Sequence, residues 1–292
     1  MRQIKPIRAN TKCSSDCRVW QPSSFQDFLV ELNHIIKSCD GDDPAPLFRG
    51  QINHKWYIDS TFLRNCIKRT FSISDYHQLS KKIRHTDSFH NTMISLLQLK
   101  FGTVCKPSQE SLGLEKSKNI DPWFELLKNL QQYPEKDKFI TGTFLVDWSC
   151  SRNIALYFAT YIEKGKTRSV SSEDGALWIY DSVATGDTLQ IEKLSKTISK
   201  MIDNKNILSA KKTLPLIFHP QKQTLQSRSK GQMPIYIAQM DFRYDLTNVW
   251  ADYEKENKKK VFIKLILNKN LKCDAGKYLL SQGVDENSVY PE

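Results

Sequence analysis

Several residues that could perform chemistry lie at one corner of the sequence, where an apolar stretch gives way to a helical pattern. Phe144 to Val146 has the residue types of a buried strand, and Asp147, a residue type that caps helices, follows it. Apolar residues then recur at helical spacing over 155–159. Many folds present side chains to a ligand at such a strand end, so this corner is a candidate ligand site. Its members are Asp147, Trp148, Ser149 and Ser151.

A second candidate is Arg49, which lies in the short predicted strand from Pro46 to Gln51. A guanidinium binds phosphate through two parallel hydrogen bonds, and a glycine lets a ligand approach the backbone closely. The structural alternative is an ion pair that holds the arginine in place. The polar residues from Ser227 to Gln232, just before another predicted strand, are a further place where a site could be assembled.

Cysteine and histidine residues do not form a metal-binding pattern. The seven cysteines are scattered, and only Cys13 and Cys17 lie close together, without a second pair at metal spacing. His77, His85 and His90 do not share one helix face cleanly. We therefore expect reduced thiols and no metal.

The elements that must position these residues follow from the hydrophobic periodicity. Ser24 can cap a helix over 25–36, and further helical spacing covers 76–101, 123–133 and 275–282. Branched and aromatic residues predict strands at 175–180, 234–238 and 261–267. The Trp56-Tyr57 pair is interpreted as core. We expect one α+β domain over 23–292, with a flexible lead-in at 1–22 and a Lys-rich insertion around 188–212.

The chain of 292 residues is strongly basic, with 43 Lys and Arg against 32 Asp and Glu and a net charge of +11. Such a charge favours a polyanionic partner such as nucleic acid, a nucleotide ligand or an acidic neutralising protein, although a solvated basic surface is the alternative. No signal peptide and no apolar run of membrane-spanning length appear. We expect a soluble, cytoplasmic protein with no membrane partner.

Motifs over nearly the whole chain resemble the FRG-domain family, which is called after its Phe-Arg-Gly signature. Phe48-Arg49-Gly50-Gln51 matches the signature. Leu145 to Ala159 is the most specific match, because it is similar to Leu-Leu-Asp-Trp-Thr followed by Ala-Leu-Tyr-Phe-Ala. Further resemblances are Trp56 to Arg64 with Trp...Pro-Ser-Leu...Arg, Leu130 to Tyr133 with Gln-His-Tyr-Gly, Arg228 and Gln232 with Arg...Gln-Gly-Phe, and Gly283 to Glu292 with Gly...Phe-Pro-Asp.

The chain departs from the family pattern at three places. Gln132 stands where the family has His, Pro134 to Lys138 are inserted, and Gly142-Thr143-Phe144 replaces Pro-Thr-Arg. A member with these departures keeps the expected fold while its target or part of its site can differ.

The order of the motifs also resembles the ADP-ribosyltransferase superfamily. This resemblance implies a split antiparallel β core with surrounding helices and NAD as a substrate. It implies that Arg49 binds the NAD phosphates or the adjacent ribose, and that Ser149 and Ser151 fix the nicotinamide ribose. Trp148 or Tyr157 would stack on a ring, and Gln232 would occupy the third motif. The implied NAD-binding set is Phe48, Arg49, Gly50, Gln51, Trp148, Ser149, Ser151, Tyr157 and Arg228, and the catalytic set is Arg49, Asp147, Ser149 and Gln232.

Cleavage of NAD requires a negatively charged group, usually a carboxylate, beside the ribose. Breaking the nicotinamide glycosidic bond develops an oxocarbenium-like cation, which a carboxylate that also binds the ribose 2′-hydroxyl usually opposes. Gln232 is neutral and cannot supply that charge, so Asp147 is the best alternative. The structural alternatives for Asp147 are a helix N-cap or a partner of Arg49.

The basic charge favours a nucleic-acid acceptor, RNA or single-stranded DNA, contacted by Lys255 to Lys260 and by the lysines over 193–212. A protein that modifies its own cell's nucleic acid would be a toxin, as in antiphage defence, and would need an antitoxin or chaperone partner. Two other classes remain open. One is a nucleotide or nucleic-acid binding module without chemistry, and the other is a nuclease in which Asp147, Asp181 or Asp241 holds Mg²⁺.

Overall fold

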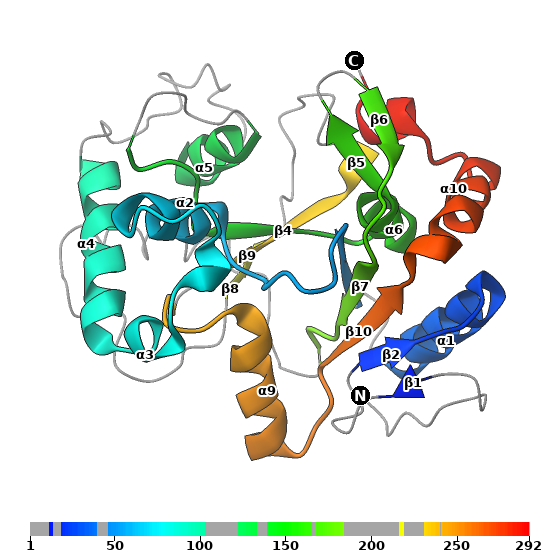
Figure 1. The fold of residues 1–292 in the computed structure, drawn as a ribbon, viewed down its shortest axis with the longest axis horizontal. Coiled ribbons are helices and arrows are strands. Elements are labelled where there is room, and N and C mark those ends of the chain that lie inside the picture. Colours follow the sequence, from blue (N-terminus) through cyan, green and yellow to red (C-terminus); the bar gives the residue numbers. More distant parts are fainter. Residues whose placement is uncertain are drawn as a thin grey trace.

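A mixed eight-stranded sheet forms the centre of the protein, whose structure is a computed structural model (Figure 1). The structure describes residues 12–13, 19–39, 46–102, 122–132, 139–164, 167–183, 216–218, 231–239 and 241–291. The strand order is β1-β2-β10-β7-β3-β4-β9-β8, in which β10 and β2 are parallel and the other neighbours are antiparallel. These strands are β1 (Lys12–Cys13), β2 (Val19–Gln21), β3 (Leu47–Gln51), β4 (Leu145–Ser149), β7 (Gly175–Tyr180), β8 (Leu216–Phe218), β9 (Pro234–Ala238) and β10 (Phe262–Leu267).

Helices cover the sheet on both flanks in the view of Figure 1, with α2 to α5 at the left, α1, α6 and α10 at the right and α9 below. β5 (Tyr161–Lys164) and β6 (Thr167–Val170) form a separate antiparallel hairpin. None of the helices in the described ranges combines the length and apolar character that a membrane span needs. The helical elements are α1 (Phe25–Ser38), α2 (Thr61–Thr70), η1 (Tyr76–Gln78), α3 (Lys81–Arg84), α4 (Asp87–Gly102), α5 (Pro122–Gln132), α6 (Arg152–Thr160), α9 (Leu246–Asn257), η2 (Lys269–Leu271), α10 (Lys272–Ser281) and α11 (Glu286–Val289).

The α+β class expected from the sequence agrees with this mixed architecture. α1 begins where expected, because the Ser24 side chain accepts a hydrogen bond from the Asp27 amide, and Phe28, Leu32 and Ile35 are buried along one face. The predicted helix over 76–101 is instead η1, α3 and α4. Breaks between them coincide with local capping residues, since Ser80 accepts a hydrogen bond from the Lys82 amide at the start of α3.

The N-terminal part of the chain contributes to the sheet, contrary to the expectation of a flexible lead-in over 1–22. Val19–Gln21 pairs with β10, and Trp20 is fully buried there. An indole of this size contributes to the core beside α1, which explains why the strand joins the sheet. The Lys-rich segment expected as an insertion around 188–212 lies outside the described residues.

Asp147 lies within a strand, so the structural alternative that it caps the following helix is wrong. β4 continues to Ser149 because Asp147 pairs with Tyr236 of β9 and Ser149 pairs with Pro234. The N-cap of α6 is Ser151, whose hydroxyl accepts a hydrogen bond from the Ile154 amide at 3.4 Å. The Asp147 carboxylate is therefore not occupied by helix capping.

β3 and β4 separate almost as soon as they meet. Phe48 opposite Ser149 is the one residue pair that joins them, whereas β3 pairs along its length with β7 and β4 pairs along its length with β9. The sheet is thus split between two well-paired halves. Arg49, one residue beyond the shared pair, donates from Nη1 to the backbone carbonyl of Asp147 across the split.

Gly50 fixes how closely α6 lies over β3. A Cβ atom at this position would lie 1.7 Å from the Ala155 carbonyl oxygen and 2.7 Å from the Ala159 amide nitrogen. Backbone atoms cannot be moved aside as the end of a flexible side chain can, so only glycine permits this approach. The glycine of the Phe-Arg-Gly stretch serves helix packing.

Replacing Gly50 by Ala should therefore destabilise the fold strongly. Overpacking against backbone costs about 1–3 kcal/mol or more, so we expect a melting temperature several degrees lower, or insoluble protein. Thermal unfolding followed by circular dichroism measures the effect. Gly276→Ala is the matched control, because its added Cβ would meet only the end of the Tyr161 side chain, at 2.6 Å from the hydroxyl oxygen, and no backbone atom, and because alanine is favoured in a helix. Equal stability of Gly50→Ala and the wild type would contradict the packing role.

Candidate active site

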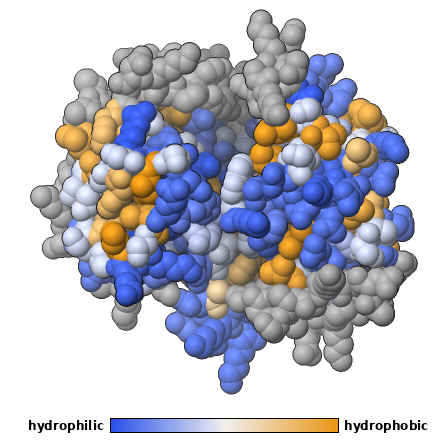
Figure 2. Space-filling view, in the orientation of Figure 1, coloured by the Kyte–Doolittle hydropathy of each residue, from blue (hydrophilic) through white to orange (hydrophobic). Residues whose placement is uncertain are grey.

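A pocket of about 430 Å³ opens beside the split between β3 and β4. Figure 2 shows this face of the molecule hollowed near its middle, between the left-hand helices and the right-hand elements. The lining comes from β3 and the segment after it, β4, α2, α5, α6, β5, β6, β9 with the chain just before it, and the segment after α11. The pocket brings together nine of the residues expected from the sequence, namely Phe48, Arg49, Gly50, Gln51, Asp147, Trp148, Ser149, Tyr157 and Gln232.

Arg49, Arg64 and Asp147 line one part of the pocket, which we call the charged end. Both arginines have a buried donor without a hydrogen-bond partner. The Arg49 Nη1 group donates to the Asp147 carbonyl, but its Nε is buried without a hydrogen-bond partner. Arg64 of α2 donates from Nη2 to the Thr61 hydroxyl at 3.3 Å, and its Nε is likewise buried without a partner. Buried donors are nearly always paired in folded proteins, so two orphaned guanidinium nitrogens in one pocket point to a ligand.

Asp147 is the acid of this site, and Gln131 holds it in place. The Gln131 Nε2 group donates to Asp147 Oδ2 at 3.0 Å, while the Thr143 hydroxyl donates to Gln131 Oε1 at 2.6 Å and so fixes the amide. The second oxygen, Oδ1, accepts no hydrogen bond from the described residues. The carboxylate still reaches solvent through the pocket, which leaves one oxygen available to a ligand.

Burial and neighbouring charges act in opposite directions on these groups. Desolvation raises the pKa of Asp147, while the Gln131 hydrogen bond and the charges of Arg49 and Arg64 lower it. Desolvation also lowers the pKa of Arg49 to about 10, an effect that Asp147 opposes and Arg64 increases. Arg49 therefore stays protonated at neutral pH, and the charged end holds two guanidinium groups against one carboxylate. The surplus positive charge favours an anionic ligand.

The two serines expected to contact ribose brace the corner between β4 and α6. The Ser149 hydroxyl donates to the Gln232 carbonyl at 2.8 Å and accepts from the Ser151 amide at 3.0 Å. Ser151 caps α6 and does not line the pocket. The Gln232 side chain donates from Nε2 to the Val289 carbonyl at 3.4 Å, which ties the turn before β9 to α11. These contacts hold the corner and the turn together.

The Trp148 ring belongs to the core on the other face of the sheet. Side chains alternate along a strand, so Trp148 points away from the face that Asp147 presents to the pocket. Its ring packs edge-on against Tyr180 and Trp250, with centroids 6.1 and 5.5 Å apart, and the residue is 3% exposed. The indole is thus not positioned to stack on a ligand.

Phe48 and Gln51, which flank Arg49 and Gly50 in β3, are held by contacts within the fold. Phe48 is buried in the core between the sheet and α6. Gln51 is also buried, and its amide oxygen accepts from the Trp178 indole at 2.7 Å while its nitrogen donates to the Tyr57 carbonyl at 3.3 Å. Both polar atoms of this amide are therefore engaged, and Arg49 is the residue of β3 that retains binding capacity.

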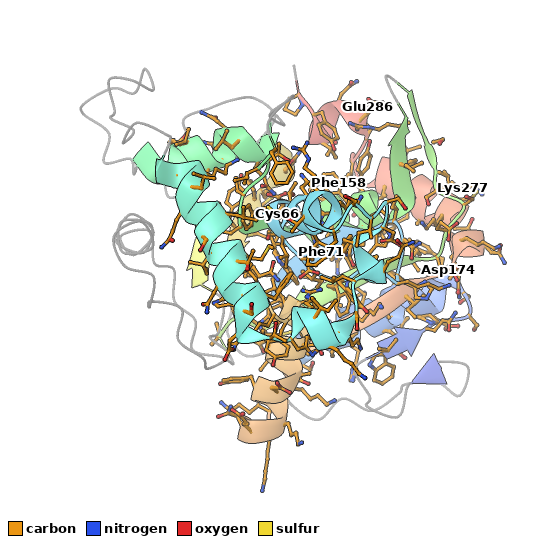
Figure 3. The ribbon with its side chains drawn as sticks, turned by 60° about the vertical axis from the view of Figure 1, so that its left-hand side comes forward. Cys66, Phe71, Phe158, Asp174, Lys277 and Glu286 are labelled. Carbon is orange, nitrogen blue, oxygen red and sulfur yellow. The ribbon has the colours of Figure 1, made fainter. Side chains whose placement is uncertain are left out.

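An aromatic wall, defined as Tyr157, Phe158 and Tyr290, lines another part of the pocket with Arg168. Arg168 donates from Nη1 to the Tyr157 hydroxyl at 2.6 Å, and its guanidinium lies 3.7 Å from the centroid of the Tyr290 ring. Phe158 packs edge-on against Tyr290 at 6.2 Å. Glu286 lies 3.6 Å from Arg168 Nε, and Figure 3 shows Phe158 and Glu286 toward the same end of the molecule. Planar groups of a ligand could stack on this wall.

Several pocket residues were not identified from the sequence. Arg64, Gln131, Arg168 and Tyr290 come from segments that are distant from the strand corner in the chain. Arg64 and Gln131 do lie in stretches that resemble family motifs, which was the available signal. Trp56, expected as core, lines the pocket and is 38% exposed, because it follows the end of β3 in a turn. Arg228 and the Gln132 side chain lie outside the described residues.

The carboxylates considered for a metal-dependent nuclease do not converge. Asp241 bonds with Arg243, at 2.7 Å from Oδ2 to Nη2, and Asp181 is fully buried at the end of β7. Over the described part of the chain, no group of three or more His, Cys, Asp or Glu side chains is arranged to hold a metal ion.

Replacing Asp147 by Asn should make the folded protein slightly more stable at neutral pH. The pKa of the Asp147 carboxyl is higher in the folded protein than in the unfolded chain. The protonated carboxyl therefore stabilises the fold at a pH below the unfolded pKa, and this stabilisation is lost as the pH rises through the folded pKa. Asparagine removes the charge and keeps an acceptor for Gln131, so the melting temperature should rise and depend less on pH. The rise should be small, because solvent in the pocket screens the charge.

Thermal unfolding between about pH 4 and pH 8 measures this effect, over the range in which a raised aspartate titrates. Asp274→Asn, an exposed aspartate in α10, is the control and should change stability by less than about 0.5 kcal/mol. Lower stability of Asp147→Asn at neutral pH would show that the charged form is favoured in the fold.

Comparisons with known proteins leave the family of this chain open. No protein-family model, curated protein or solved structure matches it. The functional inference therefore depends on the residues of the pocket and their geometry.

Proposed function

We propose that this protein is an ADP-ribosyltransferase that binds NAD in the pocket beside the β3–β4 split. One observation carries the proposal. Arg49 on β3, Asp147 and Ser149 on β4 and Gln232 before β9 come from three neighbouring strands and line a single pocket. The resemblance to the ADP-ribosyltransferase superfamily assigns Arg49 and Ser149 to NAD and Gln232 to the third motif, and the need for a carboxylate adds Asp147. The split between β3 and β4 supports the corresponding split antiparallel core.

The size and charge of the pocket suit a dinucleotide. Its volume of about 430 Å³ lies within the usual range of small-molecule sites. The NAD diphosphate carries negative charge, which would compensate the surplus positive charge of Arg49 and Arg64 beside Asp147. The aromatic wall would accept a ring of the ligand. The charged end and the aromatic wall thus match the two kinds of group that NAD contains.

Asp147 would provide the chemical assistance. When the bond between ribose C1′ and the nicotinamide nitrogen breaks, its electron pair leaves with nicotinamide and positive charge develops on the ribose. Asp147 Oδ1 could accept the 2′-hydroxyl proton in a hydrogen bond and oppose that charge, while Gln131 holds Oδ2. An acceptor atom then bonds to C1′ and loses its proton to solvent. Gln232 would position the turn, since its amide is bonded to Val289.

We further propose that the acceptor is nucleic acid, RNA or single-stranded DNA, and that the protein is a cytoplasmic toxin of antiphage defence with an antitoxin or chaperone partner. The net charge of +11 supports a polyanionic acceptor. Lys255, Lys258 and Lys259 are exposed at the end of α9 and could contact phosphates.

A binding module without chemistry is the second candidate. The observation that favours it is the engagement of the Ser149 hydroxyl and the Gln232 amide in contacts within the fold. Such a module would bind a nucleotide through Arg49 and would not consume NAD.

Purified protein should transfer label from NAD labelled in its adenylate portion to RNA or single-stranded DNA, offered separately beside DNA duplex and cell protein. Arg49→Ala should lose transfer through weaker NAD binding. Asp147→Asn should keep NAD binding and lower the transfer rate by about 100-fold or more, because the charge it removes matters most in the transition state. Transfer is read as acid-precipitable label and nicotinamide release by chromatography.

Arg69→Ala is the control for Arg49→Ala, because it also removes an arginine, but one that is exposed and outside the pocket lining. Normal NAD binding with neither transfer nor nicotinamide release, in a folded preparation tested with every acceptor class, would favour the binding module. Transfer to protein alone would contradict the nucleic-acid acceptor.

Replacing Lys255, Lys258 and Lys259 together by Ala should weaken single-stranded nucleic-acid binding while leaving nicotinamide release unchanged. The slope of log affinity against log salt should fall by about 0.7 for each phosphate that the variant no longer neutralises. Fluorescence anisotropy of a labelled oligonucleotide at several salt concentrations gives that slope. Unchanged affinity and slope would show that these lysines are only a solvated face.

A further inference from the structure

The Arg64 guanidinium forms no ion pair with a carboxylate of the described residues. Arg64 lies in the middle of α2 and lines the pocket. Its one hydrogen bond from the described residues goes to the Thr61 hydroxyl, one helical turn earlier, and its Nε is buried without a partner. A helix in water would place such a side chain in solvent, as it does Arg69. Arg64 instead lines the pocket from a half-buried position, and its Nε donor is buried without a partner.

Arg49 has the same combination of features on the neighbouring strand. Its Nε is also buried without a partner, and it lines the same pocket as Arg64. The charge of Arg64 lowers the pKa of Arg49. Asp147 is the one carboxylate among the described residues that line the pocket. Two guanidinium groups that share one carboxylate leave a surplus positive charge, which an anionic ligand would compensate.

We propose that Arg64 and Arg49 form a two-armed clamp for a diphosphate, with one guanidinium group for each phosphate. The choice of NAD as the natural source of that diphosphate rests on the proposed function. A guanidinium presents Nε and one Nη as parallel donors, which match two oxygens of a phosphate. Each arm of the clamp has an Nε without a partner and an Nη group besides the one that bonds within the fold.

The rest of the pocket favours a nucleoside diphosphate over a free anion. The charged end continues into the aromatic wall of Tyr157, Phe158 and Tyr290, on which a base could stack. A simple carboxylate would occupy one guanidinium and leave the other unpaired. A diphosphate esterified to a nucleoside satisfies both arginines and also uses the apolar surface beside them.

Isothermal titration calorimetry with ADP-ribose, inorganic pyrophosphate and adenosine separates the two parts of the ligand. Arg64→Gln should weaken ADP-ribose and pyrophosphate binding by about 10- to 100-fold, the range for loss of a charged hydrogen-bonding group. Adenosine binding should be unchanged. Arg64→Lys should recover part of the affinity, because it restores the charge without the paired donors. Arg69→Gln should match the wild type.

The unfolding temperature of each variant shows whether the fold is intact, and Arg64→Lys keeps the test decisive if Arg64→Gln does not fold. Unchanged ADP-ribose affinity in Arg64→Lys and Arg64→Gln would overturn the clamp, and so would an equal loss for adenosine.

Failure of the clamp and failure of the proposed function give different results. Pyrophosphate and ADP-ribose binding that depends on Arg64, in a protein that never releases nicotinamide from NAD, would support the clamp and contradict the transferase. Nicotinamide release and transfer that are unaffected in Arg64→Gln would support the transferase and overturn the clamp.

Discussion

The contact between Gly50 and the backbone of α6 is the constraint on which the site depends. Because residue 50 has no Cβ, the helix can lie directly over β3 at Ala155 and Ala159. α6 follows β4 through a short corner, so this contact also fixes where β4 ends. The two strands then meet at a single residue pair before they separate, and the pocket opens beside the separation. Packing of a helix on a strand thus determines where the charged residues face one another.

The polar residues of this region divide into those that hold the corner and those that face the pocket. Ser149, Ser151 and Gln51 satisfy one another or their neighbours through hydrogen bonds within the fold. Arg49 and Arg64 keep buried donors without partners, and the charge of Asp147 is disfavoured by burial. Proteins retain such locally unfavourable groups mainly where a ligand compensates them. The unpaired groups are therefore better indicators of the binding residues than the motif residues around them.

The sequence predicted the local elements better than the site. The strand, the polar corner and the α6 helix were recognisable from periodicity, and the cap at Ser24 was correct. The sequence left a helix cap open as an alternative for Asp147, because its strand position depends on pairing with Tyr236, 89 positions later in the chain. Arg64 and Gln131 escaped notice as pocket residues for a similar reason. Helical spacing reveals which face of a helix is apolar, but not which distant strand a polar side chain on that helix will meet.

The most direct test is a crystal structure of Asp147→Asn soaked or grown with NAD, since this variant should bind the dinucleotide and turn it over slowly. We expect NAD in the pocket, with its diphosphate within hydrogen-bonding distance of Arg49 and its nicotinamide ribose beside residue 147. An empty pocket at saturating NAD, or NAD bound away from Arg49, would contradict NAD binding at this site.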